Sequence, residues 1–410
     1  MTVVPSRFDQ YTSDIGVAGL GYRPSMAMVA TGAFARNQAG IGHQGASGPE
    51  ASDITDLRHQ GHGCQGLDAP EAAQGHDRPS PWVAPRQPCQ VRVQVDALHT
   101  DAMDLVRRLY GLPDNYKVLF LGGGATMQFA MVPMNLMGPG GSCDMTLTGA
   151  WAKKANADAK KIGNVNLVFD GSDDNFMSLP DPASLKANPG AAYFHMTSNE
   201  TIGGVQWNDF PDSGDVPLVC DMSSDFVSRK IPVEKFGLIY AGAQKNAGPA
   251  GTSIVIIRED LLERSSADLP AYLSYATHAP KDSMYNTPPV FPIYMVMKTL
   301  QWLEKEGGLD AATKMAHERA GLIYGAMNAN PDFYKCPVQE SARSNMNIVW
   351  RLPTEDLEKQ FVAEALEAGM SGLKGHRSVG GCRASVYNAM PIAGAKALAD
   401  FMGEFAKKNG

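Results

Sequence analysis

Short apolar runs alternate with helical patterns along the chain from about residue 96 onward. Residues 97–109 place their apolar side chains on one face and precede Gly111, which predicts a helix. Further helices are predicted over residues 126–136 and 151–161. The predicted strands span residues 117–121, 145–148, 165–169, 192–196, 217–220, 237–240 and 253–257. This alternation predicts an α/β domain with a mostly parallel central sheet.

The pattern changes after the proline-rich residues 287–292. Long amphipathic stretches follow over residues 293–306 and 309–327, which predict a connecting helix and the start of a smaller C-terminal α+β domain. The last predicted helix spans residues 392–408. We therefore expect a large domain over residues 96–300 and a small domain over residues 301–410.

Residues 1–95 hold neither a helical nor a strand period for long. The chain has no lysine before Lys117, and five of its nine histidines lie in the first 99 residues. Three interpretations are open: a poorly ordered extension, a metal-binding arm, or a segment translated out of register with an ancestral reading frame. The sudden loss of lysine and of periodicity favours the third. The metal-binding interpretation would use ligand types that suit zinc, but their spacing matches no closed zinc site; the residues are His59, His62, Cys64 and His76.

Composition and charge exclude several classes of function. The 410 residues carry a net charge of −7, whereas a nucleic-acid binder would show a basic stripe or domain. No apolar run reaches the length of about 18 residues that a membrane span needs, and the start shows no secretory signal. The six cysteines are scattered and form no CxxC pair, which suits a reduced cytoplasmic protein better than a disulfide framework. We expect no metal in the site.

The most informative motif is a lysine in a loop of small residues. Lys245 follows an apolar strand and lies among Ala and Gly residues, where desolvation would lower its pKa and activate its amine for a Schiff base. Upstream, Asp221 ends another apolar strand, so its carboxylate would face the ligand crevice of a parallel sheet. For each residue alone there is a simpler alternative: Lys245 would be an exposed loop lysine, and Asp221 would be a residue that caps the next turn. Together they match the chemistry of pyridoxal phosphate (PLP), which needs an amine and a carboxylate for the pyridine nitrogen.

Two further motifs indicate anion binding. The run Gly122-Gly123-Gly124 opens a helix at Ala125 and Thr126, where backbone N–H groups form a phosphate cradle unless the glycines serve only a tight turn. The glycine-rich loop at residues 375–385 carries cations suited to a carboxylate or a phosphate, although such a loop can also be a solvated surface. These cations are His376, Arg377 and Arg383. Trp151 is a candidate for stacking on a flat ring, though a lone tryptophan is more often core.

Together these motifs resemble the phosphoserine aminotransferase family, which belongs to class V of the aspartate-aminotransferase-like PLP enzymes. The resemblance runs from about residue 97 to residue 410. Beside the lysine loop, it rests on residues 112–120, 128–136, 197–201, 285–289 and 375–391. The family has PLP-dependent transferase fold type I, so the resemblance implies that fold here.

The resemblance also implies a role for each matching residue. Lys245 would form the Schiff base and move the proton, Asp221 would pair with the pyridine nitrogen, and Trp151 would stack on the ring. Thr201 would bind the phenolic oxygen of the cofactor. The cofactor phosphate would be bound by Ala125, Thr126 and Gln244, together with Asn286 and Thr287 from the neighbouring subunit of a homodimer. The substrate phosphate would be bound by His376 and Arg377, and the substrate carboxylate by Arg383.

The implied reaction transfers an amino group from glutamate to 3-phosphohydroxypyruvate, giving O-phosphoserine and 2-oxoglutarate in serine biosynthesis. Some members also act on 4-phosphohydroxythreonine in pyridoxine biosynthesis. Two alternatives remain open: a related class V transaminase of other specificity, and a catalytically silent protein with the PLP fold. The number of cations near residue 376 disfavours the first, and the presence of both Asp221 and Lys245 disfavours the second.

The family pattern breaks in the first 95 residues. The family has a Ser-His-Arg loop shortly before the helix at Leu98, but this chain reads Pro85-Arg86-Gln87-Pro88 there. A missing histidine and arginine would remove charge-assisted hydrogen bonds worth about 1.5–3 kcal/mol each. The sequence therefore predicts the family fold from about residue 97 onward, with weakened or absent turnover.

Overall fold

The computed structural model describes residues 88–410, with side chains from residue 94 onward. The interpretations of residues 1–87, including the histidine-rich arm, lie outside this range. In the described part, no three or more His, Cys, Asp or Glu side chains gather in a way that could hold a metal ion. Its helices include none that is long and apolar enough to cross a membrane.

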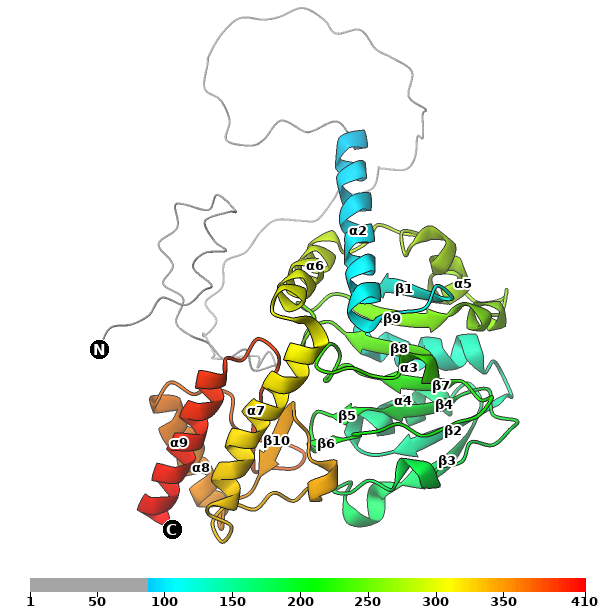
Figure 1. Cartoon of the computed structure of the whole chain (residues 1–410). Helices are drawn as coiled ribbons and strands as arrows, with labels where there is room; N and C mark the ends of the chain where they lie inside the picture. The colour runs from blue at the N-terminus through cyan, green and yellow to red at the C-terminus, as the bar shows by residue number, and fades with distance from the viewer. Residues whose placement is uncertain (1–87) are drawn as a thin grey trace, which may run out of the picture. The chain divides into compact units, whose positions relative to one another are not determined.

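The central element of the fold is a seven-stranded sheet in the order β1-β9-β8-β7-β4-β2-β3 (Figure 1). Its strands are β1 Tyr116–Leu121, β2 Ser142–Leu147, β3 Asn164–Asp170, β4 Phe194–Thr197, β7 Leu218–Asp221, β8 Phe236–Gly242 and β9 Ser253–Arg258. The strands from β8 to β3 pair in parallel, and β9 is antiparallel to both of its neighbours, β1 and β8. The predicted α/β class and mostly parallel sheet are confirmed.

Helices cover both faces of this sheet because its strands alternate apolar side chains between two cores. On β1, Val118 and Phe120 enter the core that contains α2 and α6, whereas Leu119 and Leu121 enter the core that contains α3 and α4. The helices of this domain are α2 Pro88–Tyr110, α3 Gly124–Leu136, α4 Ala150–Ala159, α5 Tyr275–His278 and α6 Val290–Lys305. A two-stranded hairpin, β5 Asn199–Glu200 and β6 Val205–Gln206, follows β4.

A third core lies in the C-terminal part of the chain. Its elements are α7 Gly308–Asn328, β10 Asn347–Trp350, α8 Glu355–Glu367, β11 Cys382–Ser385 and α9 Ile392–Asn409. The strands β10 and β11 pair antiparallel, and the C-terminal half of α7 packs with α8 and α9 around Phe361. Helix α7 also contributes Leu309 and Ala312 to the core of the large sheet. The predicted division of the chain near residue 300 stays a prediction.

Predicted and observed elements differ mainly at their ends. The helix predicted from residue 97 begins at Pro88, and the helix predicted from residue 126 begins at Gly124. Helix α8 and the β5–β6 hairpin were absent from the sequence prediction. Strand β7 ends at Asp221 and β8 runs to Gly242, so the predicted site motifs leave the sheet at the carboxyl ends of neighbouring parallel strands.

Candidate active site

The lysine turn follows directly from β8. After Gly242 the chain folds into turns in which Ala243 and Ala247 are fully buried, and Lys245 lies half-buried between them. Its Nζ donates a hydrogen bond to Thr201 Oγ1 at 2.7 Å and lies 5.2 Å from the centroid of the Trp151 ring. The amine is therefore held at a fixed point above the carboxyl end of the sheet.

Burial in this turn lowers the pKa of Lys245 below its usual value, while the nearby carboxylates of Asp221 and Glu200 oppose that change. A less basic amine has a larger unprotonated fraction near neutral pH, and only the unprotonated amine is a nucleophile. The desolvation expected from the small residues around Lys245 is thus present in the structure.

Asp221 occupies the end of β7, level with Thr197 of β4 on one side and Tyr240 of β8 on the other. Its Oδ1 accepts hydrogen bonds from Ser223 N at 2.9 Å and Ser223 Oγ at 2.6 Å. The same hydroxyl accepts from Gly242 N at 3.1 Å, which ties the carboxylate to the start of the lysine turn. Burial raises the pKa of Asp221, and the bonds from Ser223 and the charge of Lys245 work against it.

Trp151 lies in the first turn of α4, with its ring half-buried near the lysine amine. Lys154 Nζ lies 4.1 Å from the centroid of the same ring. The backbone N–H of Trp151 is bound by the buried carboxylate of Glu200, which follows Asn199 in β5. A flat aromatic surface, an amine and two carboxylates therefore meet at one place.

The glycine run after β1 forms the N-terminus of α3. Gly123 and Gly124 adopt left-handed backbone conformations with φ of 84° and 63°, which other residues rarely adopt. No side chain caps this helix end, Ala125 is half-buried and Thr126 is exposed. The N–H groups at this helix end are free of side-chain caps, as an anion site requires, and the binding of a phosphate there stays a prediction.

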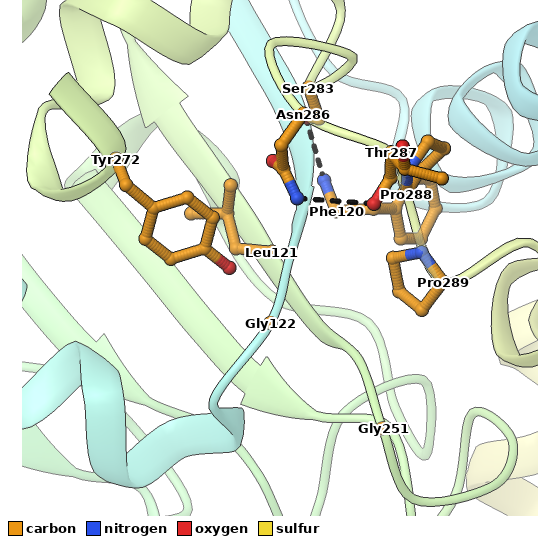
Figure 2. Close-up of a pocket in the computed structure, with 10 residues that line it drawn as sticks. All are labelled: Phe120, Leu121, Gly122, Gly251, Tyr272, Ser283, Asn286, Thr287, Pro288 and Pro289. Carbon is orange, nitrogen blue, oxygen red and sulfur yellow. Dashed lines mark hydrogen bonds between the residues drawn. The ribbon is translucent and has the colours of Figure 1, made fainter. Parts of the chain in front are cut away.

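Asn286 and Thr287 lie apart from the lysine turn, around a different cavity of about 240 Å³. Figure 2 shows them across this cavity from Tyr272, with Gly122 and Gly251 also on its wall. Both residues are exposed, and Asn286 Nδ2 donates to Thr287 O at 3.1 Å. Their expected action on the cofactor of a neighbouring subunit stays a prediction.

The glycine-rich loop of the small domain carries its cations to the same side as Lys245. A cavity of about 120 Å³ is lined by His376 and Arg383 together with Ile202 and Gly203, which directly follow Thr201. Arg383 Nη1 donates to Thr201 O at 3.0 Å, and its charge lowers the pKa of Lys245.

The pKa of His376 is lowered first by burial and then by three positive neighbours, Arg383, Arg377 and Lys154. We call His376 and these three residues the cation cluster. Three cations that repel one another beside a histidine indicate a polyanionic ligand, because such a ligand relieves the repulsion and favours the charged form of the histidine.

The structure thus brings together most of the predicted site residues: Lys245, Asp221, Thr201, Trp151, His376, Arg377 and Arg383. Gln244 lies beside Lys245, with its amide so close to Gly242 that a methyl group there would approach Gln244 Oε1 to 2.6 Å. Sequence reasoning missed Glu200, Ser223 and Lys154. Residues 197–201 contribute to the family resemblance, but their sequence does not indicate that the Glu200 side chain binds a helix about fifty residues away in the chain.

A protein-family comparison agrees with this geometry. The model of the class-V aminotransferases, "Aminotransferase class-V", matches residues 85–398. The phosphoserine aminotransferase of Desulfosudis oleivorans is 52% identical over 317 residues, which cover 77% of this chain and 87% of that protein. The phosphoserine aminotransferase of Laribacter hongkongensis is 51% identical over 314 residues, with the same two coverages.

Solved structures give the same result. Phosphoserine aminotransferase from Bacillus circulans subsp. alkalophilus superposes with a TM-score of 0.76 at 47% identity, over 77% of this chain and 88% of that chain. PLP-bound phosphoserine aminotransferase from Trichomonas vaginalis superposes with a TM-score of 0.70 at 38% identity, over 75% and 87% of the two chains. The resemblance that the sequence predicted is confirmed: the chain belongs to the class-V aminotransferases and, within them, to the phosphoserine aminotransferase family.

Proposed function

We propose that this protein is a phosphoserine transaminase, which moves an amino group from glutamate to 3-phosphohydroxypyruvate and so forms O-phosphoserine and 2-oxoglutarate. The observation that carries the proposal is the cation cluster beside Lys245. Relatives about 50% identical in sequence, named phosphoserine aminotransferases, support it. The four-carbon compound 4-phosphohydroxythreonine, which also carries a phosphate and a carboxylate, is the second expected substrate.

The cofactor is pyridoxal phosphate, and the residues present fit it. A desolvated lysine, a buried carboxylate at the end of β7, a flat indole and an uncapped helix N-terminus are the groups that this cofactor requires. When bound, the cofactor supplies an electron sink that stabilises negative charge at the substrate Cα. Lys245 would hold its aldehyde carbon, Asp221 its pyridine nitrogen, and Ala125, Thr126 and Gln244 its phosphate.

Each of these side chains would have its own role in amino transfer. Lys245 Nζ would take the proton from the substrate Cα and deliver it to the former aldehyde carbon of the cofactor, and the lowered pKa of Lys245 favours its unprotonated form for this task. The charge of Asp221 would keep the pyridine nitrogen protonated, and Trp151 would exclude water from one face of the ring. Thr201 Oγ1, now bound to Lys245, would donate to the phenolic oxygen of the cofactor.

The cation cluster would select the substrate. His376 and Arg377 would bind the phosphate, and Arg383, held by Thr201 O, would bind the α-carboxylate. A substrate with one carboxylate and no phosphate would leave the mutual repulsion of these cations unrelieved. This disfavours the alternative, a related transaminase that acts on an unphosphorylated amino acid.

Steady-state kinetics distinguish the two functions. The holoenzyme is mixed with O-phosphoserine, L-serine or L-alanine, and kcat/KM for amino transfer to 2-oxoglutarate is measured. Since charge-assisted bonds contribute about 1.5–3 kcal/mol each, O-phosphoserine should be preferred over L-serine by about 10³-fold or more. Equal rates with L-alanine would support the alternative, and no transfer from any of the three would support a silent protein.

We further propose that the protein acts as a cytoplasmic homodimer with shared sites. Exposed aromatic residues flank Asn286 and Thr287, with Phe291 69% exposed and Tyr285 41% exposed, which suits a surface covered by a second copy. If the sites are shared, mixing Lys245→Ala with Asn286→Ala/Thr287→Ala protomers should restore about a quarter of wild-type activity through heterodimers. No restoration after verified subunit exchange would contradict shared sites.

A further inference from the structure

Glu200 is buried beside the site, at an exposed fraction of 1%, without a role in the chemistry described above. Its Oε2 accepts a hydrogen bond from Trp151 N at 3.0 Å, and its Oε1 accepts from Ala152 N at 2.9 Å. Both donors belong to the first turn of α4, which starts at Ala150. One carboxylate therefore binds two of the N–H groups that a helix leaves unpaired at its start.

Helix α4 has no cap of its own. The residue before it is Gly149, which cannot offer a side-chain acceptor. A methyl group at Gly149 would lie 2.5 Å from Glu200 Cδ, so only glycine leaves room for the carboxylate to approach. The negative charge also lies at the positive end of the helix dipole. Glu200 lies on a hairpin that is distant from α4 in the sequence. It thus supplies the helix cap that the residue before α4, Gly149, cannot provide.

The hairpin that carries Glu200 also holds the other parts of the site. The next residue, Thr201, accepts from Lys245 Nζ through its hydroxyl and from Arg383 Nη1 through its carbonyl. The hairpin itself is fixed, because Gly204 N donates to Glu200 O at 2.8 Å and Asn199 Nδ2 donates to Ser224 Oγ at 2.7 Å. Two consecutive residues, Glu200 and Thr201, therefore position the ring of Trp151, the lysine amine and Arg383.

We propose that Glu200 is a positioning residue, which sets the Trp151 ring against the Lys245 amine and so fixes the orientation of the cofactor ring. This inference rests on the proposed function, because that function supplies the cofactor ring on which Trp151 would stack. Burial raises the pKa of Glu200 to about 7, although the two N–H donors and Lys245 lower it. The test is therefore made at about pH 8.5, where the carboxyl group is ionised.

The experiment compares Glu200→Gln and Glu200→Ala with the wild-type holoenzyme. The readouts are the PLP dissociation constant and the visible circular dichroism of bound PLP, which reports the orientation of the ring. We expect Glu200→Ala to weaken PLP binding about tenfold, or about 1.4 kcal/mol, and to reduce the dichroism per bound cofactor. Glu200→Gln keeps one acceptor oxygen and should recover part of both losses.

A second substitution, at Gly149, perturbs the same contact between Glu200 and the start of α4. Gly149→Ala displaces the carboxylate without removing it and should change the dichroism in the same direction as Glu200→Ala. The matched control is Thr354→Ala, which removes the side-chain cap of α8, where Thr354 Oγ1 accepts from Leu357 N at 3.2 Å. This control should lower the thermal midpoint of unfolding while leaving PLP affinity and dichroism unchanged.

A double-mutant cycle tests the route of the effect. In a Trp151→Phe background, Glu200→Gln should weaken PLP binding by much less than it does alone, because both changes act on the same ring. Additive losses, or dichroism at the wild-type level in folded Glu200→Ala, would overturn the inference. Failure of the proposed function is separate, since it would appear as a wild-type holoenzyme that transfers no amino group from O-phosphoserine.

Discussion

Asp221 is the residue whose charge the mechanism uses most directly. In Asp221→Asn the side chain keeps its size and can still accept from Ser223 N, but it can no longer hold a proton on the pyridine nitrogen by charge. We expect kcat to fall about 100-fold or more, which corresponds to about 3 kcal/mol of transition-state stabilisation.

The measurement is kcat with O-phosphoserine at saturating PLP, with cofactor content determined in parallel. Ser223→Ala is the matched control, because it removes one neutral bond to the same carboxylate and should lower kcat by about tenfold or less. An Asp221→Asn variant with half or more of the wild-type kcat would show that this carboxylate does not serve the pyridine nitrogen.

Single residues also show how far the sequence predicts the site. Lys245 and Asp221 were predicted because each stands at the end of an apolar strand, a signal contained in a few neighbouring residues. The hydrogen bonds of Glu200 to α4 and the electrostatic effect of Lys154 on His376 are not local in sequence. They depend on how β5, α4 and the loop of the small domain pack together, which no single stretch of the chain specifies.

At the scale of elements, α8 positions the loop that carries His376. Arg351 lies between the two: its Nε donates to Glu358 Oε1 of α8 at 2.6 Å, and its Nη1 donates to Val379 O of the loop at 3.0 Å. Arg351→Lys keeps the charge but cannot make both bonds, because an ammonium lacks the planar fork of a guanidinium. We expect KM for O-phosphoserine to rise about tenfold, since one hydrogen bond to a loop is worth about 1.4 kcal/mol here, with kcat little changed.

Steady-state kinetics with O-phosphoserine as the varied substrate check this prediction. Lys359→Gln is the control, because Lys359 lies on the same helix and pairs with the exposed Asp356. If Arg351→Lys alters kcat and leaves KM at the wild-type value, the loop is not what Arg351 positions.

Two strands of the sheet are joined by a buried pair that makes stability depend on pH. His195 Nε2 of β4 lies 2.9 Å from Tyr240 Oη of β8, and burial lowers the pKa of His195 to about 3. The native protein therefore binds fewer protons than the unfolded chain between that value and 6.5. The free energy of unfolding is therefore highest above about pH 6.5. Below that pH it falls by about 1.4 kcal/mol per pH unit, because the unfolded chain binds a proton that the buried His195 does not.

Denaturant unfolding between about pH 5 and pH 7 measures this slope. His195→Gln should reduce the slope by the contribution of one proton. Tyr240→Phe should lower stability but keep the slope, because His195 remains buried. An unchanged slope in His195→Gln would mean that other groups cause the pH dependence.

Elements were predicted where an apolar run is bounded by turn residues. The strand predicted over residues 253–257 appears as β9, but its antiparallel direction follows from pairing with β1 and β8 and has no local signal. The two-residue strands β5 and β6 are too short to have a period. Helix α8 buries Phe361 and Ala365 on one face, so its helical spacing was present in the sequence and was overlooked.

At the scale of the whole molecule, the class-V aminotransferase model matches only from residue 85 onward. The first 95 residues contain no Ser-His-Arg string, which the family resemblance led us to expect, so the substrate phosphate would be left without two of its expected cations. We expect kcat/KM for O-phosphoserine to be about 10²- to 10⁴-fold below that of the Desulfosudis oleivorans relative, assayed side by side. Equal values would show that other residues replace the missing charges.

The most direct test of the whole account is the visible absorbance of the purified protein with PLP, recorded before and after addition of O-phosphoserine. We predict the visible band of lysine-bound PLP, which O-phosphoserine bleaches toward the spectrum of pyridoxamine phosphate, while Lys245→Ala shows neither the band nor the change. A wild-type spectrum that keeps its band when O-phosphoserine is added, or that never develops one, would contradict the assignment of a phosphoserine transaminase.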